Sequence, residues 1–382
     1  MSDANGLKHQ PEAIVQKPRG CYRTPLYRLT MAAATRCSCE RVNLPTKIAV
    51  PLISLDRIKP EHVQWLWPGR VPLGKITILQ GDPGIGKSTI ALDIASRVST
   101  KQPMPDGSLS DSENAADVLL LSAEDGPADT IRPRLDALGA DQRRVTIPGE
   151  NRHLQIPSEL SLIQDALQRL DAKLCVIDPL AAFLDTSINS WNNQHVRRAL
   201  APLAGVAQQT GAAILIVDHL NKREGIPAVH RGSGSIGFNA AARSVLMASK
   251  HPEEPETFVL SNVKCNLCAP PISLAYRMAD ANNGVLKLEW LGECPFDADE
   301  LVTAAFKATS NRKLQAAVDW LRVRLASASA LSKVVEKEAL EMGFSARTLA
   351  RARKQLGVIS QPSGLQGEWV ISLPAGIALL VK

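Results

Sequence analysis

The chain has 382 residues, of which 45% are hydrophobic and 21% charged, and its formal net charge is +6. This balance is ordinary for a soluble globular protein, and the length predicts two or three domains. No apolar run approaches the ~18 residues of a transmembrane helix, and no secretory signal pattern begins the chain, so we expect neither a membrane protein nor a secreted one. A cytoplasmic protein is the expectation.

The charge is divided unevenly along the chain. Residues 1–47 carry 8 basic and 3 acidic side chains, residues 301–382 carry 12 and 5, and residues 48–300 carry 24 and 30. A mildly acidic middle with two basic ends favours appended segments that contact a polyanion such as DNA. The alternative for either end is a solvated basic surface that has no partner.

The first 50 residues mix Pro, Arg and small residues without periodicity, which predicts a disordered basic tail over residues 1–50. Cys37 and Cys39 lie in this tail and could form a split zinc site with Cys265 and Cys268. Only the second pair has CxxC spacing, so we expect ordinary reduced thiols rather than a metal site.

A strand over residues 75–80 and a helix over residues 89–97 are predicted after Trp65 and Trp67. The two tryptophans could stack on a nucleotide base, although packing at the edge of a domain is the favoured interpretation. Between strand and helix, the pattern G-x-x-x-x-G-K-[ST] is filled at every fixed position. Its residues, with the one that follows, are Gly81, Asp82, Pro83, Gly84, Ile85, Gly86, Lys87, Ser88 and Thr89.

This glycine-rich turn predicts a phosphate-binding loop. Its glycines allow successive backbone N–H groups to point inward, and the helix adds its positive N-terminal end. Lys87 can reach the β- and γ-phosphates, and the Ser88 hydroxyl can bind Mg²⁺. We therefore expect an NTPase that uses ATP and Mg²⁺.

Three later segments predict buried strands that end in ionisable residues. Residues 116–123 end at Glu124 and Asp125, residues 173–177 end at Asp178, and residues 212–217 lead to His219. Carboxylates at the carboxyl ends of strands lie where ligands bind in open α/β sheets, and Asp178 fits the second NTPase carboxylate that serves Mg²⁺. Because strands alternate with helices, we expect an α/β fold with a mainly parallel sheet.

The C-terminal region predicts a second, smaller domain over residues 301–382, after a linker over 293–300. Helices over 312–326, 331–342 and 346–356, followed by a hairpin, are typical of winged-helix architecture. The third helix has one basic face (Arg347, Arg351, Lys354) opposite one apolar face (Leu349, Ala352, Leu356). This predicts a recognition helix that contacts DNA, with a protein-contact module as the alternative.

The order of motifs after the phosphate loop carries a family resemblance. The runs are Ser122-Ala123-Glu124-Asp125, Val176-Ile177-Asp178-Pro179, His219-Leu220-Asn221-Lys222, Arg231-Gly232-Ser233-Gly234-Ser235, Ala242-Arg243-Ser244 and Val263-Lys264-Cys265-Asn266. Together they resemble the RepA-like branch of the RecA/DnaB-type ATPases of plasmid and phage replication, over about residues 63–292. The resemblance implies a RecA-like ATPase domain over 51–295 and a winged-helix-like DNA-binding domain over 301–382.

The resemblance also implies roles for single residues. Glu124 would polarise the attacking water, with Asp125 as the alternative, and His219 would sense the γ-phosphate unless it is a structural histidine. Arg243 and Lys264 would reach the active site of a neighbouring subunit. The family pattern K-x-R is Lys264-Cys265-Asn266 here, so the usual arginine is missing and Arg243 would have to replace it.

Relatives of this kind are rings, so the resemblance implies a homo-oligomer, expected to be a hexamer. Lys222, Arg223 and Arg231 would contact the phosphates of single-stranded DNA, and the C-terminal domain would contact duplex DNA. A primase or an initiator protein is the protein partner that this function suggests. The leading hypothesis is a replicative helicase or translocase of a mobile-element or plasmid-like system. The alternative is an ATP-dependent DNA-binding regulatory or accessory protein that does not unwind DNA.

Overall fold

The computed structural model describes residues 52–149, 152, 154–189, 192–219, 236–281, 284–363 and 368–374. The chain divides into two compact units, Met1–Pro60 and Glu61–Lys382. The described part of the first unit contains a short 3-10 helix, η1 (Leu55–Arg57), whose residues are exposed. Among the described residues, no helix is long and apolar enough to cross a membrane.

A nine-stranded sheet forms the centre of the second unit, in the order β11-β10-β9-β8-β3-β7-β6-β4-β5. Strands β8, β3, β7, β6, β4 and β5 pair in parallel, whereas β8 to β11 pair with one another in antiparallel fashion. The predicted α/β fold with a mainly parallel sheet is confirmed. The strands are β3 (Ile76–Gly81), β4 (Val118–Ser122), β5 (Val145–Thr146), β6 (Leu174–Asp178), β7 (Ala213–His219), β8 (Ser244–Lys250), β9 (Phe258–Cys265), β10 (Ser273–Asp280) and β11 (Leu286–Cys294).

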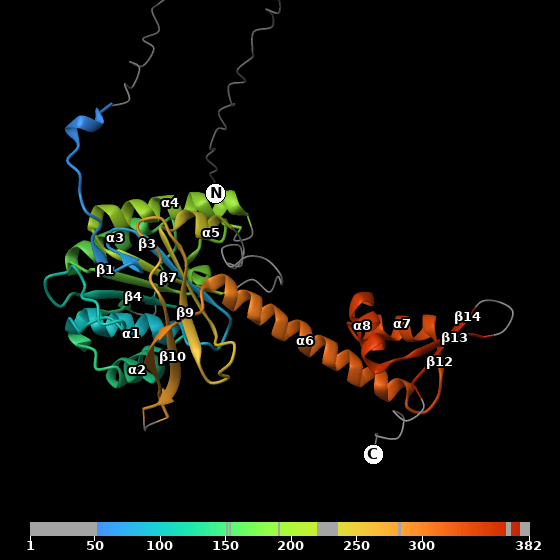
Figure 1. Cartoon of the computed structure of the whole chain (residues 1–382). Helices are drawn as coiled ribbons and strands as arrows, with labels where there is room; N and C mark the ends of the chain where they lie inside the picture. Colours follow the sequence, from blue (N-terminus) through green and yellow to red (C-terminus); the bar gives the residue numbers. More distant parts are fainter. Residues whose placement is uncertain are drawn as a thin grey trace, which may run out of the picture. The chain divides into compact units, whose positions relative to one another are not determined.

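Helices cover both faces of this sheet (Figure 1). Side chains alternate along each strand, so Leu79 and Leu120 enter one core while Ile78 and Leu121 enter the other. The first core is closed by α1 (Lys87–Thr100) and α2 (Arg132–Ala137), which follows a π-helical turn, η2 (Pro127–Ile131). The second core is closed by α3 (Leu160–Leu170), α4 (Asn193–Thr210) and α5 (Ile236–Ala241). Two 3-10 turns, η3 (Gln142–Arg144) and η5 (Leu180–Phe183), connect other elements.

The tryptophan segment before the phosphate loop belongs to the core. It forms a two-stranded hairpin, β1 (Trp65–Trp67) with β2 (Val71–Pro72). Trp67 is buried, packs edge to face against Trp290 with the ring centroids 5.9 Å apart, and donates a 3.0 Å hydrogen bond from Nε1 to Asp106. Core packing, the favoured interpretation for this segment, is confirmed for Trp67.

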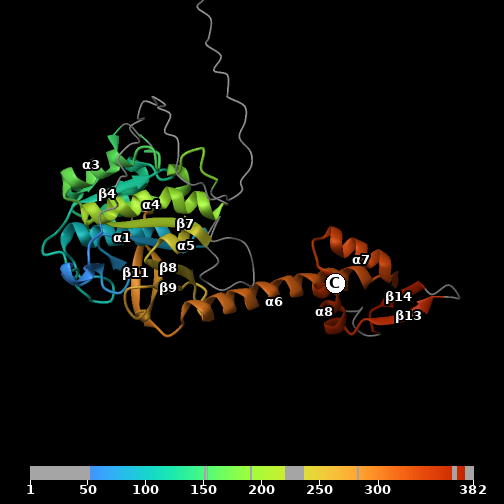
Figure 2. The same ribbon diagram turned by 90° about the horizontal axis from the view of Figure 1, so that it is seen from above.

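The linker predicted over residues 293–300 is wrong. Strand β11 continues to Cys294, and a long helix, α6 (Ala298–Leu325), begins shortly afterwards. Asp297 and Glu300 form a capping box, in which each side chain accepts a hydrogen bond from the other residue's backbone N–H. The first turns of α6 pack against β8 and β9 (Figure 2). The acidic residues that suggested a linker are therefore the start signal of a helix.

The remaining residues form a separate cluster around the second half of α6. It contains β12 (Ala330–Leu331), α7 (Ser332–Glu341), α8 (Ala346–Leu356), β13 (Ile359–Ser363) and β14 (Glu368–Ser372). The strands pair in antiparallel fashion in the order β12-β14-β13, and a buried core includes Leu321, Val335, Leu349 and Ile371. The helices and the hairpin expected here are present, although the first helix begins at Ala298, well before its predicted start at Arg312.

Candidate nucleotide site

The glycine-rich turn joins β3 to α1, as the sequence pattern predicts. Gly86 stands at the N-terminus of α1 with φ 84°, a left-handed conformation that favours glycine. A Cβ at Gly81 would overlap the Ile85 side chain and lie 2.7 Å from the Ala248 carbonyl oxygen, so a larger residue has no room there. The turn therefore presents the N-terminus of a 14-residue helix at the carboxyl edge of the sheet, an arrangement suited to phosphate.

Lys87 is buried at the start of α1 and is surrounded by acidic groups. Its Nζ donates a 2.9 Å hydrogen bond to the backbone carbonyl of Asp82. Burial lowers the pKa of Lys87, while Asp178, Asp82, Asp218 and Glu124 act in the opposite direction. The ammonium group is thus held inside the turn, where a phosphate oxygen can replace the carbonyl as its acceptor.

Ser88 and Asp178 meet at the ends of α1 and β6. The Ser88 hydroxyl donates a hydrogen bond to the Asp178 carboxylate. Burial raises the pKa of Asp178 to about 6, with further contributions from Asp125 and Glu124, and Lys87 opposes this rise. The Ser88 hydroxyl and the Asp178 carboxylate offer oxygen ligands of the kind that Mg²⁺ prefers, and a divalent cation there would stabilise the charged form of Asp178. Ser88 and Asp178 therefore fit the metal role predicted for them.

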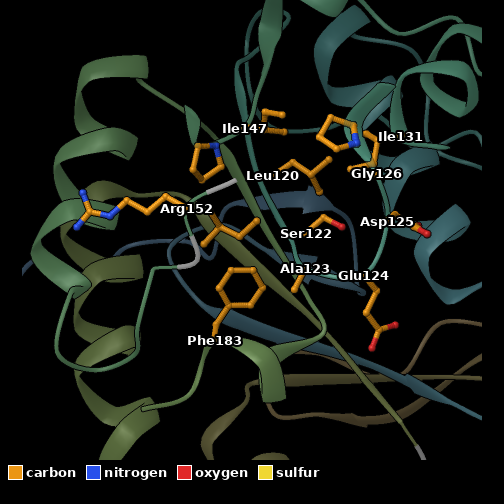
Figure 3. Close-up of a pocket in the computed structure, with 13 residues that line it drawn as sticks. Leu120, Ser122, Ala123, Glu124, Asp125, Gly126, Ile131, Ile147, Arg152 and Phe183 are labelled. Carbon is orange, nitrogen blue, oxygen red and sulfur yellow. The ribbon is translucent and has the colours of Figure 1, made fainter. Parts of the chain in front are cut away.

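Glu124 and Asp125 follow β4, and their carboxylates point in different directions (Figure 3). Asp125 forms an ion pair with Arg134 at 2.7 Å. Glu124 is exposed and makes no hydrogen bond or ion pair with the residues that the structure describes. A carboxylate without a partner can accept a proton from water, which favours Glu124 over Asp125. Both residues also line a cavity of about 220 Å³ that Ile147, Arg152 and Phe183 help to enclose.

His219 ends β7, directly beside the phosphate loop. It lies opposite Gly81 in the parallel pairing of β3 with β7. Its Nδ1 is buried and has no hydrogen-bond partner among the described residues. Burial and then the charge of Lys87 lower the pKa of His219, and Glu124 opposes this shift. A neutral imidazole with a buried ring nitrogen is compatible with the predicted contact to a γ-phosphate.

Arg243 and Lys264 lie at the other end of the sheet from the phosphate loop. Arg243 directly precedes β8, and its N–H donates to the carbonyl of Ile76, the first residue of β3. Five residue steps along the strand separate Ile76 from Gly81, a distance of about 16 Å. An arginine side chain cannot span that distance, so Arg243 does not reach the phosphate loop of its own chain.

Lys264 differs from Arg243 in its surroundings. Its Nζ donates hydrogen bonds to the carbonyls of Asn239 at 2.7 Å and Ala242 at 2.9 Å. It therefore holds the C-terminal end of α5, whereas the Arg243 side chain is exposed. Burial, and then the charges of Arg243 and Arg197, lower the pKa of Lys264. Of the two cations, Arg243 is the more accessible to another chain.

The predicted DNA contacts divide into two groups. Lys222, Arg223 and Arg231 lie outside the described residues. On α8, Arg347, Arg351 and Lys354 are exposed and the three apolar residues of the opposite face are buried, as the periodicity predicts. Arg351 donates a 3.2 Å hydrogen bond to the Ser310 hydroxyl on α6, so it is less available than the other two.

Strand β10 contributes a part of the site that the sequence patterns do not predict. The Tyr276 hydroxyl donates a 2.7 Å hydrogen bond to the Ile85 carbonyl, and the Met278 sulfur would be 2.8 Å from a Cβ at Gly86. Both residues are almost 200 positions from the loop in sequence, and neither belongs to a recognisable motif. Only the sheet order reveals their proximity to the phosphate loop.

Comparisons with known proteins agree with a P-loop nucleotide site. A family model described as AAA domain matches residues 40–225, which include the phosphate loop, Glu124, Asp178 and His219. The DNA repair protein RadA of Bacillus subtilis is 29% identical over 199 residues, or 51% of this chain and 39% of that protein. RadA of Streptococcus pneumoniae is 28% identical over 182 residues, or 47% of this chain and 38% of the relative. The chain thus spans about two fifths of the length of these relatives.

A solved structure of a KaiC-like protein from Pyrococcus horikoshii OT3 covers 59% of this chain and 99% of its own, with 15% identity and a TM-score of 0.42.

Proposed function

We propose that this chain is a P-loop ATPase that assembles into a ring and moves along or unwinds DNA. One observation carries the ATPase part of the proposal. A buried lysine, a serine–aspartate pair, an exposed glutamate and a neutral histidine surround one glycine-rich turn. These are the groups that positioning and hydrolysis of a γ-phosphate require.

The chain's own residues account for the hydrolysis step. The phosphate loop and Lys87 would bind the β- and γ-phosphates, and Ser88 and Asp178 would hold Mg²⁺, which supplies charge neutralisation when bound. Glu124 would accept a proton from the water whose oxygen attacks the γ-phosphorus. The bond from that phosphorus to the β-phosphate oxygen breaks, and ADP leaves. His219 would contact the γ-phosphate and register its departure.

The position of Arg243 favours the proposed assembly of the chain into a ring. It cannot reach the phosphate loop of its own chain, yet it is exposed and lies beside a second cation, Lys264. A neighbouring subunit could receive it, as the RepA-like resemblance implies, and in-trans arginines accelerate NTP hydrolysis in other enzymes by roughly 10³–10⁵. A hexamer is the assembly that the resemblance favours.

DNA is the proposed track for this motor. The name of the RadA relatives refers to DNA repair, and α8 presents a basic face opposite a buried apolar one. A winged-helix-like unit of this kind would contact duplex DNA, while Lys222, Arg223 and Arg231 would contact a single strand. Within this proposal, plasmid- or mobile-element-type replication is the biological setting, with a primase or an initiator protein as a partner.

One observation favours a second candidate, an ATP-dependent DNA-binding regulator without unwinding activity. Asn266 stands where the RecA/DnaB pattern has an arginine, and Lys264 is engaged with α5. A ring with one in-trans cation would hydrolyse ATP slowly, which suits a nucleotide-controlled assembly better than a motor.

Three measurements on the purified chain test the proposal. ATPase activity is compared with and without single-stranded DNA, the assembly mass is measured with ATP, and strand separation is followed on a forked duplex. Lys87→Ala is the control for contaminating ATPases. DNA-stimulated hydrolysis with unwinding supports the motor, and DNA-dependent assembly without unwinding supports the regulator. Absence of Lys87-dependent hydrolysis contradicts both.

A further inference from the structure

The strongest chemical feature outside the nucleotide site is a pair of cysteines at the end of β9. Cys265 is the last residue of that strand, and Cys268 follows in the next turn. Their sulfur atoms are 3.5 Å apart, within hydrogen-bond distance. Cys268 is exposed and Cys265 is half-buried, so small molecules in solution can reach the pair.

The other described cysteines have a different environment. Cys175 and Cys294 are buried, and burial raises the pKa of Cys175 to about 12. Because both side chains are buried, oxidants in solution do not reach their sulfur atoms. Among the described residues, no group of three or more His, Cys, Asp and Glu side chains could hold a metal ion. Exposure distinguishes the pair at the end of β9 from these two cysteines, while Cys37 and Cys39, the other half of the zinc site considered from the sequence, lie outside the described residues.

Both sides of the pair are fixed to the fold. Cys265 lies opposite Ser244 in the antiparallel pairing of β8 with β9. Before the turn, Asn262 on β9 donates a 3.0 Å hydrogen bond to the Gly69 carbonyl. After the turn, the Ile272 carbonyl accepts a hydrogen bond from Arg70. A turn held at both ends keeps the two sulfur atoms together.

The same turn supports the backbone of the proposed in-trans cation. The N–H of Asn266, which lies between the two cysteines, donates a 3.1 Å hydrogen bond to the carbonyl of Arg243. Lys264 directly precedes Cys265 in the chain. A change in the geometry of the turn therefore acts on both cations.

We propose that Cys265 and Cys268 are a reversible redox site, which a hydroperoxide converts to a disulfide that alters the position of Arg243. Closing the bond requires the sulfur atoms to approach from contact distance to about 2.0 Å. The covalent ring then includes Asn266, so its closure should shift the N–H that bonds to the Arg243 carbonyl. The link to Arg243 rests on the proposed function, whereas disulfide formation does not.

The chemistry balances with hydrogen peroxide as the oxidant. One thiolate attacks a peroxide oxygen, the O–O bond breaks, and the leaving hydroxide takes a proton to give water and a sulfenic acid. The second thiol attacks the sulfenic sulfur, the S–O bond breaks, and a second water leaves. The two sulfurs lose two electrons in total and the peroxide gains them. Partial desolvation and then Cys265 raise the pKa of Cys268 to about 11, so oxidation should accelerate as the pH rises.

The site is tested on the full chain, in a background that carries Cys21→Ser, Cys37→Ser and Cys39→Ser. After treatment with hydrogen peroxide, free thiols are alkylated and the peptide that contains both cysteines is weighed. The expected result is an unalkylated peptide whose mass is about 2 Da below that of the reduced peptide. Dithiothreitol should reverse this change. Cys268→Ser is the matched control and should give an alkylated or overoxidised Cys265. A peptide that remains fully alkylated, or one that is linked to another peptide, overturns the proposal.

The link to Arg243 is tested on the same samples by ATPase activity. Oxidation should reduce turnover in the protein that has both cysteines, dithiothreitol should restore it, and Cys268→Ser should not show the reversible loss. Unchanged turnover despite complete disulfide formation overturns the link and leaves the redox site standing. A chain without ATPase activity contradicts the proposed function instead, because the mass measurement does not depend on hydrolysis.

Discussion

The hydroxyl of Tyr276 donates a 2.7 Å hydrogen bond to the backbone carbonyl of Ile85, inside the phosphate loop. Tyr276 is fully buried, and its ring stacks on Phe258 with the centroids 5.5 Å apart. A loop that binds phosphate as proposed would use its N–H groups for that ligand, so its carbonyls must find donors elsewhere. Tyr276 supplies one of these donors from a strand almost 200 residues away, and thereby fixes the conformation of the loop.

Tyr276→Phe should weaken ATP binding more than it slows turnover. The substitution keeps the ring and leaves the Ile85 carbonyl unpaired, at a cost of about 1–2 kcal/mol, or roughly five- to thirtyfold in affinity. A titration with a fluorescent ATP analogue gives the dissociation constant. Phe258→Leu is the control, since it disturbs the same aromatic cluster without touching the loop and should lower thermal stability at unchanged affinity. Equal affinity for wild type and Tyr276→Phe would show that the hydroxyl does not position the loop.

The raised pKa of Asp178, about 6, predicts how stability depends on pH without Mg²⁺. A carboxyl group whose folded-state pKa lies above its unfolded value binds more protons when folded, so stability falls as the pH rises from about 4 through about 6. Asp178→Asn removes this loss and should stabilise the metal-free protein at pH 7 by on the order of 3 kcal/mol, because a shift of about two pKa units corresponds to that free energy. Urea denaturation at pH 5 and pH 7 measures the difference.

With Mg²⁺ and ADP at pH 7, the wild type should instead become more stable than Asp178→Asn. The metal stabilises the charged carboxylate of the wild type and finds no such group in Asp178→Asn. Ser249→Ala, on β8, is a control that leaves the metal ligands unchanged. If Asp178→Asn gains as much stability from Mg²⁺–ADP as the wild type does, Asp178 is not a metal residue.

The roles of Glu124 and Asp125 can be separated by matched substitutions. Glu124→Gln should bind ATP with near-normal affinity and hydrolyse it at least about 100-fold more slowly, because general base catalysis contributes on that scale. Asp125→Asn should mainly weaken the ion pair with Arg134 and slow turnover far less. Single-turnover hydrolysis with radiolabelled ATP measures both. The opposite ranking would assign the water-polarising role to Asp125.

The phosphate loop and its carboxylates could be predicted from sequence because they depend on local patterns. A glycine-rich turn between a strand and a helix, and acids that end buried strands, are properties of short segments. The mutual positions of Glu124, Asp178 and His219 then follow from one rule, that parallel strands end at the same edge of the sheet. The mainly parallel sheet could be predicted for the same reason.

What the sequence did not predict depends on distant pairing. Tyr276 reaches the phosphate loop through the order of the antiparallel strands, which no short pattern encodes. The start of α6 was missed because Asp297 and Glu300 resemble a polar linker unless their reciprocal capping is recognised. The bonds from Lys264 to α5 depend on the end of a short helix 25 residues earlier, which its motif does not indicate.

The basic face of α8 should carry salt-sensitive binding to duplex DNA. Arg347 and Lys354 are exposed, whereas Arg351 is engaged with Ser310. The double variant Arg347→Ala with Lys354→Ala should lower the slope of log affinity against log salt by about 2. Lys333→Ala with Lys337→Ala, on the exposed face of α7, removes the same charge and should change the slope little. Equal effects of the two variants would indicate nonspecific attraction rather than a recognition helix.

Arg243 provides the test of a shared active site. Its backbone is bonded to Ile76 at the amino end of β3, so its charge can stabilise the transition state only in another subunit. Arg243→Ala should therefore abolish most hydrolysis, by roughly 10³-fold, with little loss of ATP affinity or thermal stability. Arg198→Ala, on the exposed surface of α4, is a control for loss of an exposed arginine.

Mixing separates a shared site from an internal one. Arg243→Ala subunits keep an intact phosphate loop, and Lys87→Ala subunits keep an intact arginine. In mixed rings, some intact loops face an intact arginine, so hydrolysis should reappear although each variant alone is inactive. Subunit exchange is checked by energy transfer between labelled chains, because recovery requires it. If exchange is complete and no activity returns, or if Arg243→Ala alone hydrolyses ATP normally, Arg243 does not act across a subunit boundary, and the cation that completes the site must come from another part of the chain.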